Sequence, residues 1–99
     1  MKITRNMTST GCELALEGRL DTSTAPELEK EINDVMDGLI ELTLDFKCLD
    51  YISSAGLRVL LAAQKQMNKQ GSMTLCNVNA DIMEIFDITG FSDILTIAK

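Results

Sequence analysis

Residues 42–67 read LTLDFKCLDYISSAGLRVLLAAQKQM, a strand-like segment followed by a helix-like one. Apolar and polar residues alternate over residues 39–46, which is the two-residue period of a strand. Over residues 55–70 the apolar residues recur at helical spacing, and Gly71 is a typical helix stop. The apolar stripe that we expect to be buried on this helix consists of Leu57, Leu60, Leu61 and Met67.

Upstream of this stretch, the sequence predicts two strands and a helix. Strands are expected at residues 2–7 and 12–20, with Gly11 in the turn between them, and such a pair is typical of a hairpin. Residues with capping side chains follow, and Pro26 suits the first turn of a helix that Gly38 ends. The apolar positions of this helix are Leu28, Ile32, Val35 and Met36.

Downstream, we expect a strand at residues 73–78, a short helix at 80–88, a break at Gly90 and a last strand or short terminal element at 94–97. Helical crossovers between strands place those strands parallel in one sheet. The predicted fold is therefore α/β, with a small mixed β-sheet, an N-terminal antiparallel hairpin and helices packed against the sheet.

Size and composition limit the organisation of the chain. Its 99 residues suffice for one compact domain, which we expect to span residues 1–99. With 45% hydrophobic but only 4% aromatic residues, the core should be aliphatic. No apolar run approaches the roughly 20 residues of a membrane span, and the first ten residues are polar. We therefore predict a cytoplasmic protein that does not insert into a membrane.

Charge and the absence of histidine exclude several function classes. Fifteen acidic residues against 9 basic ones give a net charge of -6, which disfavours a nucleic-acid partner. The lack of histidine removes the usual base of a serine or cysteine nucleophile and a common zinc ligand. No metal is expected at the acidic run Glu27, Glu29, Glu31, Asp34 and Asp37, which lacks calcium-loop spacing. Buried, reduced thiols without a disulfide are expected at Cys12, Cys48 and Cys76.

Function is expected at the loops that leave the carboxyl ends of the strands, where open sheets meet ligands and partners. These loops are residues 21–24 and 49–56. Ser53 and Ser54 stand where the second loop joins the long helix, and unpaired backbone N–H groups and the helix dipole favour negative charge there. Two readings stay open: one serine only caps the helix, or the pair forms a site for a phosphate.

Three separated motifs also occur in the order and at the spacings of one known family. Residues 42–67 contain an apolar pair followed by Ser-Ser-Ala-Gly-Leu, residues 18–32 read GRLDTSTAPELEKEI, and residues 85–97 read IFDITGFSDILTI. Together they resemble the STAS domain family, the bacterial anti-sigma factor antagonists, over essentially all 99 residues. The resemblance implies a single STAS domain. The family has an aspartate where this chain has Ser53.

The resemblance implies a partner-switching regulator. The unphosphorylated form would bind an anti-sigma factor with serine kinase activity and so release a sigma factor, and phosphorylation of Ser54 would end the binding. A PP2C-like serine phosphatase would reset the chain, which would need no cofactor of its own. Ser53 is the second choice of phosphate acceptor. The expected partner-binding residues are Asp21, Thr22, Ser53, Ser54, Ala55, Gly56 and Arg58.

Several alternatives remain open. Ser53 in place of the family aspartate keeps open an adaptor subunit of a lipid-transport ATPase or of a stress-signalling complex, without a phosphorylation cycle. A hydrolase with Ser54 as nucleophile is disfavoured, because no base stands near it in sequence, so we predict that the chain is not an enzyme. Asp21 is either a partner contact or only a turn residue. The basic helix face that includes Arg58 either steers a partner or only interacts with solvent.

Overall fold

The computed structural model describes residues 1–98 and contains a four-stranded sheet in the order β1-β2-β3-β4. Strands β1 and β2 are antiparallel, whereas β3 is parallel to both β2 and β4. The predicted mixed α/β sheet with an opening hairpin is confirmed. The elements in chain order are β1 (Lys2–Met7), β2 (Gly11–Leu20), α1 (Ala25–Met36), β3 (Glu41–Ile52), α2 (Ser54–Gln70), β4 (Ser72–Cys76), α3 (Ala80–Thr89) and the 3-10 helix η1 (Phe91–Asp93).

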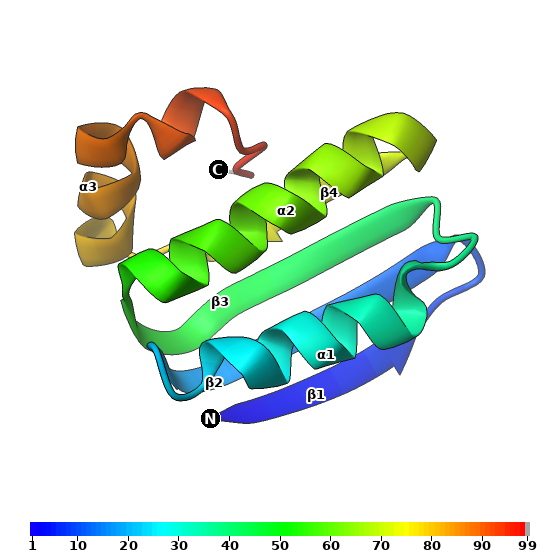
Figure 1. The fold of residues 1–99 in the computed structure, drawn as a ribbon, viewed down its shortest axis with the longest axis horizontal. Coiled ribbons are helices and arrows are strands. Elements are labelled where there is room, and N and C mark those ends of the chain that lie inside the picture. The colour runs from blue at the N-terminus through cyan, green and yellow to red at the C-terminus, as the bar shows by residue number, and fades with distance from the viewer. Residues whose placement is uncertain (99) are drawn as a thin grey trace.

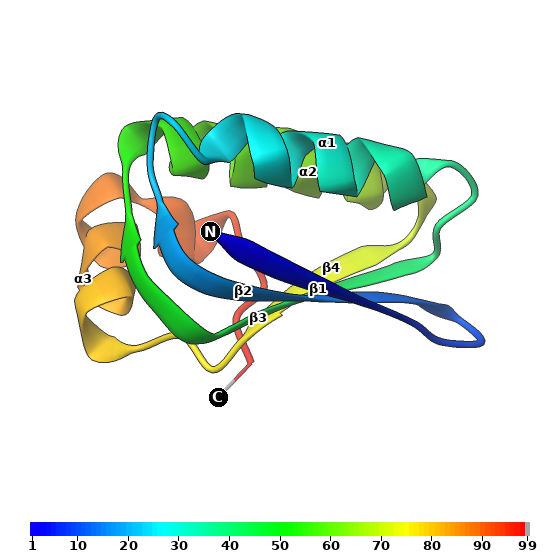
Figure 2. The same ribbon diagram turned by 90° about the horizontal axis from the view of Figure 1, so that it is seen from below.

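The helices cover one face of the sheet and one of its ends. Helices α1 and α2 lie side by side on the same face (Figures 1 and 2). Helix α3 lies beyond the end of the sheet at which β2 and β3 finish (Figure 1). Asn79 ties it there, because its side-chain amide donates to the Leu49 carbonyl of β3 at 3.1 Å. In residues 1–98, no helix covers the opposite face of the sheet (Figure 2).

The core lies between the sheet and helices α1 and α2, and it is aliphatic as expected, with Phe46 and Phe86 as its fully buried aromatic side chains. On α2, three of the four predicted stripe residues are buried, but Leu61 is only half-buried. Val59 and Ala63 are buried instead. The stripe is displaced because α2 packs on α1 as well as on the sheet.

Strand β3 is longer than the sequence predicts, since it continues past Phe46 to Ile52. The expected loop of residues 49–56 is therefore wrong, and only Ser53 separates β3 from α2. The pairing with β2 explains the error. Twice along its pairing with β2, β3 contains one residue more than β2 does. The first extra residue lies before Cys48 and the second is Asp50. These bulges break the two-residue period that identifies a strand in sequence.

The cysteines are free thiols in different surroundings. Cys12 is buried as predicted, and burial raises the pKa of its thiol. Cys48 is exposed, so the prediction of a buried thiol is wrong there. It follows the first bulge and lines a small hollow of about 90 Å³ with Thr4 and Asp45. Cys76 is half-buried, and burial raises the pKa of its thiol as well.

The C-terminal segment adds a short extension to the sheet. Leu75 forms an isolated parallel bridge with Ile97. The backbone N–H of Leu75 donates to the Thr96 carbonyl at 2.9 Å, and that of Ala98 donates to the Leu75 carbonyl at 2.8 Å. The last predicted element is thus a bridge beside β4. Among residues 1–98, no helix has the length and apolar character that crossing a membrane requires.

Candidate functional site

The site forms where β2 and β3 end next to each other. Leu20 pairs with Ile52 as the last residues of the two parallel strands. One residue further on, the backbone N–H of Ser53 donates to the Leu20 carbonyl at 2.9 Å. This bond brings the turn after β2, which begins at Asp21, beside the start of α2 at Ser54.

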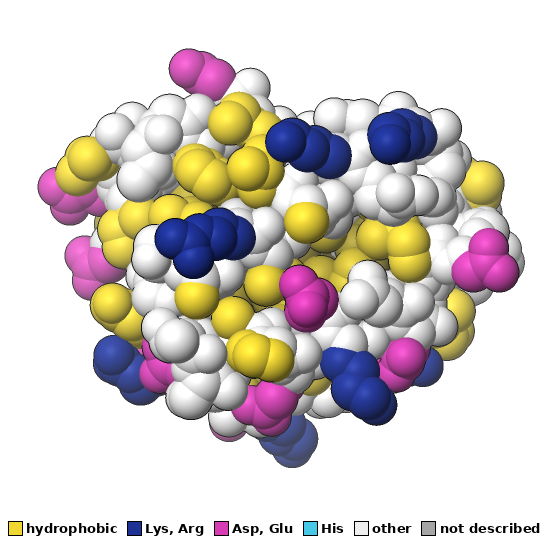
Figure 3. All heavy atoms as spheres, in the orientation of Figure 1, with side chains coloured by type: hydrophobic (Ala, Val, Ile, Leu, Met, Phe, Trp, Pro, Cys, Tyr) yellow, Lys and Arg dark blue, Asp and Glu magenta, His cyan; other side chains and the backbone are white. Residues whose placement is uncertain are grey.

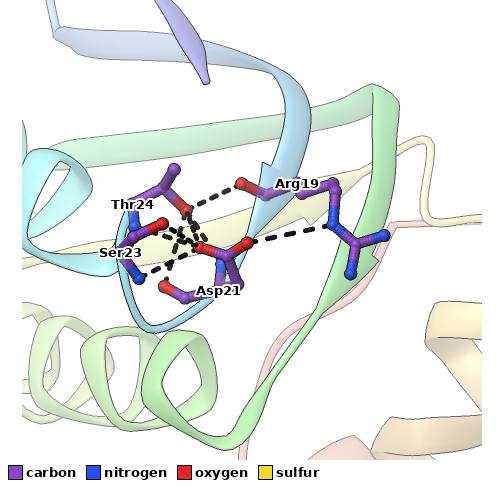
Figure 4. A network of polar contacts seen from close by, with 4 residues as sticks. All are labelled: Arg19, Asp21, Ser23 and Thr24. Atoms are coloured by element: carbon purple, nitrogen blue, oxygen red, sulfur yellow. Dashed lines mark hydrogen bonds and ion pairs between the residues drawn. The ribbon is translucent and has the colours of Figure 1, made fainter.

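The turn after β2 is organised by Asp21 (Figure 4). Its Oδ1 atom accepts from the backbone N–H groups of Ser23 at 3.0 Å and Thr24 at 3.2 Å, and from the Ser23 hydroxyl at 2.8 Å. The Thr24 hydroxyl accepts from the Asp21 N–H at 2.8 Å and donates to the Arg19 carbonyl at 2.7 Å. The Ser23 hydroxyl and these other hydrogen bonds lower the pKa of the Asp21 carboxyl. The turn role of Asp21 is therefore confirmed, and its contact with a partner stays a prediction.

The serines at the start of α2 differ from Asp21 in how their side chains are used. Ser53 occupies the N-cap position with extended backbone, and its carbonyl accepts from the Leu57 N–H at 3.0 Å. Its hydroxyl is buried, and no atom of residues 1–98 forms a hydrogen bond with it. Ser54 is the first residue of the helix and is exposed, and no side-chain hydrogen bond within residues 1–98 involves its hydroxyl. Neither serine caps α2 through its side chain, so the reading as a plain helix cap is wrong.

A true cap elsewhere in the chain shows the contrast. The Asn79 side chain at the N-terminus of α3 accepts from the Ile82 N–H at 2.8 Å. At α2, no side chain of the described residues 1–98 caps the backbone N–H groups of the first turn in this way. Together with the helix dipole, they favour an anion at Ser54.

Gly56 allows the helix to start this close to the strands. A Cβ atom at this position would lie 2.6 Å from Leu20 Cγ and 2.9 Å from Ile52 Cγ1. Any larger residue would push α2 away from the ends of both strands. Gly56 itself is buried, and its contact with a partner stays a prediction.

The other predicted residues surround this point. Ser54, Thr22 and Arg58 are exposed, and Ala55 is half-buried. A surface hollow of about 240 Å³ brings together Thr22, Ala25, Pro26, Glu29, Ala55, Arg58 and Val59. It lies on the face formed by α1 and α2, where apolar side chains gather over the seam between the two helices and charged side chains flank it (Figure 3).

Two residues at this end of the sheet were missed by the sequence reasoning. The guanidinium carbon of Arg19 lies 4.2 Å from the centroid of the Tyr51 ring. The Arg19 Nε atom is also 3.8 Å from Asp21 Oδ2 (Figure 4). Arg19 lies opposite Tyr51 only because of the second bulge in β3, so no local sequence pattern predicts this contact.

The acidic side chains of α1 form ion pairs with basic residues. The Arg5 guanidinium donates to Glu31 and lies 3.8 Å from Asp34, and Lys30 lies 3.8 Å from Asp34. In the part of the chain that the structure describes, no cluster of three or more acidic or cysteine side chains could hold a metal ion.

The fold is that of a small α/β domain, and comparison with known proteins gives its family. The STAS domain family matches residues 2–99. The chain belongs to the STAS domain family. Proteins of this family in general act by binding rather than by catalysis.

Three relatives show how the family members are named. BtrV of Bordetella bronchiseptica, whose name assigns it provisionally to the anti-sigma factor antagonists, is 38% identical over all of this chain and 87% of its own length. The anti-sigma-B factor antagonist of Bacillus subtilis is 31% identical over 87% of this chain and 80% of its own. The anti-sigma factor antagonist SpoIIAA in its unphosphorylated form has the same fold, with a TM-score of 0.78 and 16% identity over 99% of this chain and 88% of SpoIIAA. The phosphorylated form of this Bacillus protein has a TM-score of 0.76 and 18% identity over 99% of this chain and 92% of SpoIIAA.

Proposed function

We propose that this chain is an anti-sigma factor antagonist that is switched by phosphorylation of Ser54. Its unphosphorylated form binds an anti-sigma factor that is also a serine kinase, and this binding releases a sigma factor. Phosphorylation of Ser54 ends the binding, and a PP2C-like serine phosphatase restores it. The names of the relatives support the antagonist role, and SpoIIAA, which has this fold, exists in both phosphorylation states.

One observation carries the proposal: Ser54 is exposed at the start of α2, and no side-chain hydrogen bond within residues 1–98 involves its hydroxyl. A kinase needs an acceptor hydroxyl that it can reach. Ser53 fits less well, because its hydroxyl is buried. This difference favours Ser54 over Ser53 as the acceptor.

The local charges explain how one phosphate could act as a switch. A phosphoserine carries about -1.5 to -2 charges at pH 7 and three acceptor oxygens. Within the chain, the uncapped N–H groups of the first turn of α2 stabilise this charge. Arg58 stands four residues after Ser54, one helical turn away, and is exposed, so it can pair with the phosphate.

Across an interface, the same charge has the opposite effect. The chain already has a net charge of -6, and a partner that binds over Ser54 must remove water from the phosphate or face it with its own surface. Because a change of about 1.4 kcal/mol alters affinity tenfold, a penalty of a few kcal/mol is enough to exchange partners. The chain itself performs no reaction in this cycle, and ATP and magnesium belong to the kinase.

A pull-down from lysate of the source organism tests the proposal. Wild-type and Ser54→Asp baits are compared, the bound proteins are identified by mass spectrometry, and Ser54 is examined for phosphate. We expect an anti-sigma factor with a kinase fold to bind only the wild-type bait. Equal capture of a transport ATPase or of another assembly by both baits would instead identify an adaptor subunit.

A second experiment assigns the acceptor. The recovered anti-sigma factor is incubated with ATP and with wild-type, Ser54→Ala or Ser53→Ala chains, and phosphate incorporation is measured. We expect Ser54→Ala to take up no phosphate and Ser53→Ala to be phosphorylated like the wild type. Full phosphorylation of Ser54→Ala would move the acceptor to Ser53.

A further inference from the structure

Two arginines on neighbouring strands are used differently. Arg5 on β1 donates from Nε to Glu31 Oε2 at 2.9 Å and also lies 3.8 Å from Asp34. The Arg19 guanidinium on β2 donates no hydrogen bond within residues 1–98, and its ion-pair contact is the 3.8 Å approach to Asp21. The Arg19 side chain is 62% exposed, compared with 38% for Arg5. Arg5 therefore holds α1 against the sheet, whereas the N–H groups of Arg19 face solvent.

Arg19 is nevertheless held in place. Its guanidinium lies over the Tyr51 ring at 4.2 Å from the centroid, a distance typical of a cation–π contact. The bulge at Asp50 sets the two residues opposite each other. The carboxylate of Asp21, itself fixed by the turn, approaches the Nε side of the guanidinium (Figure 4). An arginine that is already ordered loses less side-chain entropy when it binds a partner.

The pair also borders the proposed partner-binding site. Arg19 lies two residues before Asp21, and Tyr51 lies two residues before Ser53. Asp21 and Ser53 begin the two segments that form the site. Both side chains are exposed, and Arg and Tyr are among the residue types that most often dominate binding energy at protein interfaces. The planar guanidinium is suited to a carboxylate, which it can bind through two parallel hydrogen bonds.

We propose that Arg19, ordered on the Tyr51 ring, is a second contact point for the protein that binds over Ser54, and that it takes a carboxylate side chain of that protein. The proposal rests on the proposed function, because it assumes a protein partner at this end of the sheet. It extends the contact surface from the start of α2 to the ends of β2 and β3. Its ligand is an acidic residue of the partner.

The test measures the affinity of the purified anti-sigma factor recovered with the wild-type bait for four chains: wild type, Arg19→Ala, Arg19→Lys and the matched control Arg5→Ala. We expect Arg19→Ala to weaken binding at least about tenfold, mainly through faster dissociation. Arg19→Lys should recover only part of the loss, because a lysine lacks the planar fork. Arg5→Ala should change affinity less than about twofold, since Arg5 is engaged within the chain.

A double-mutant comparison separates direct contact from support of Asp21. If Arg19 only holds Asp21, the double variant Arg19→Ala with Asp21→Ala will bind no more weakly than Asp21→Ala alone. If Arg19 contacts the partner, the two losses will add. Non-additive losses, or an Arg19→Ala chain that binds like the wild type, would overturn the Arg19 proposal and leave the proposed function intact. A wild-type chain that binds no anti-sigma factor would overturn both.

Discussion

The turn at Asp21 and the start of α2 at Ser53 follow neighbouring strands and lie side by side, yet they use their polar side chains in opposite ways. Asp21 Oδ1 accepts hydrogen bonds from the backbone N–H and the hydroxyl of Ser23 and from the backbone N–H of Thr24. The hydroxyl of Ser53 has no partner, and no side-chain hydrogen bond within residues 1–98 involves that of Ser54. The first turn therefore uses its polar side chains within the chain, whereas the start of α2 leaves the Ser54 hydroxyl exposed and its first backbone N–H groups without a side-chain cap.

The difference follows from local chemistry. An aspartate in a turn can accept hydrogen bonds from backbone N–H groups two and three residues ahead, which is the common Asx-type turn. Serine at an N-cap normally does the same for a helix, but the hydroxyl of Ser53 is buried and makes no such bond. A fixed turn next to an uncapped helix start agrees with the proposal that Ser54 is the residue presented to a kinase.

The largest effect on stability is expected when a buried side chain in the first turn of α2 is truncated. Leu57→Ala removes a side chain that is only 7% exposed, and we expect it to lower the free energy of unfolding by about 2–5 kcal/mol. Chemical denaturation measures the change. The matched control is Leu61→Ala one turn later, which should cost clearly less because Leu61 is half-buried. Equal losses would contradict the observed orientation of α2.

A smaller effect is expected when the start of α2 is pushed away from the ends of β2 and β3. Gly56→Ala places a Cβ atom 2.6 Å from Leu20 Cγ, and this overpacking should cost about 1–3 kcal/mol of stability. Binding of the anti-sigma factor should weaken as well, although no exposed group is changed. Ala55→Gly is the control for stability only, because it alters the same helical turn without a clash. Unchanged stability and binding in Gly56→Ala would show that the close approach is unimportant.

The contribution of the Asp21 turn to stability should depend on pH. Because hydrogen bonds lower the pKa of Asp21 in the folded chain, its contribution is fully present above the unfolded pKa of about 3.9 and is lost as pH falls through the folded value. Asp21→Asn should therefore be less stable than wild type at pH 7, and the difference should shrink as pH falls below about 4. Urea denaturation across this range measures it. A difference that is constant with pH would mean that the carboxylate charge has no part in the turn.

The smallest effect is expected at Ser53. Ser53→Ala removes a buried hydroxyl without a partner, so stability should stay unchanged or rise slightly. Asn79→Ala at the start of α3 is the matched comparison, and losing that cap should cost about 0.5–2 kcal/mol. Thermal unfolding of the two variants side by side measures both. A loss in Ser53→Ala as large as that in Asn79→Ala would show that Ser53 caps α2 in solution.

Much of the fold could be predicted from residues close together in the chain. The alternation of Leu42 and Leu44 with polar residues indicated a strand, and the helical spacing of Leu57 and Leu60 indicated α2, which begins within one residue of its expected start. For Asp21 the residue type allowed a turn role beside a partner contact, and the structure shows the turn. Such patterns succeed because hydrogen bonding and burial within one element depend on neighbours along the chain.

The order and kind of the elements, and the two hydroxyls at the start of α2, therefore follow from residues close together in the chain. The three-dimensional packing, in contrast, accounts for the continuation of β3 to Ile52, the exposure of Cys48 and the position of Arg19 over Tyr51. It also leaves the Ser53 hydroxyl buried with no hydrogen bond from residues 1–98, whereas Ser54 is exposed. These features depend on the register of β3 against β2 and on the approach of α2 to both strands, and such contacts join residues about 30 positions apart, which no local pattern encodes.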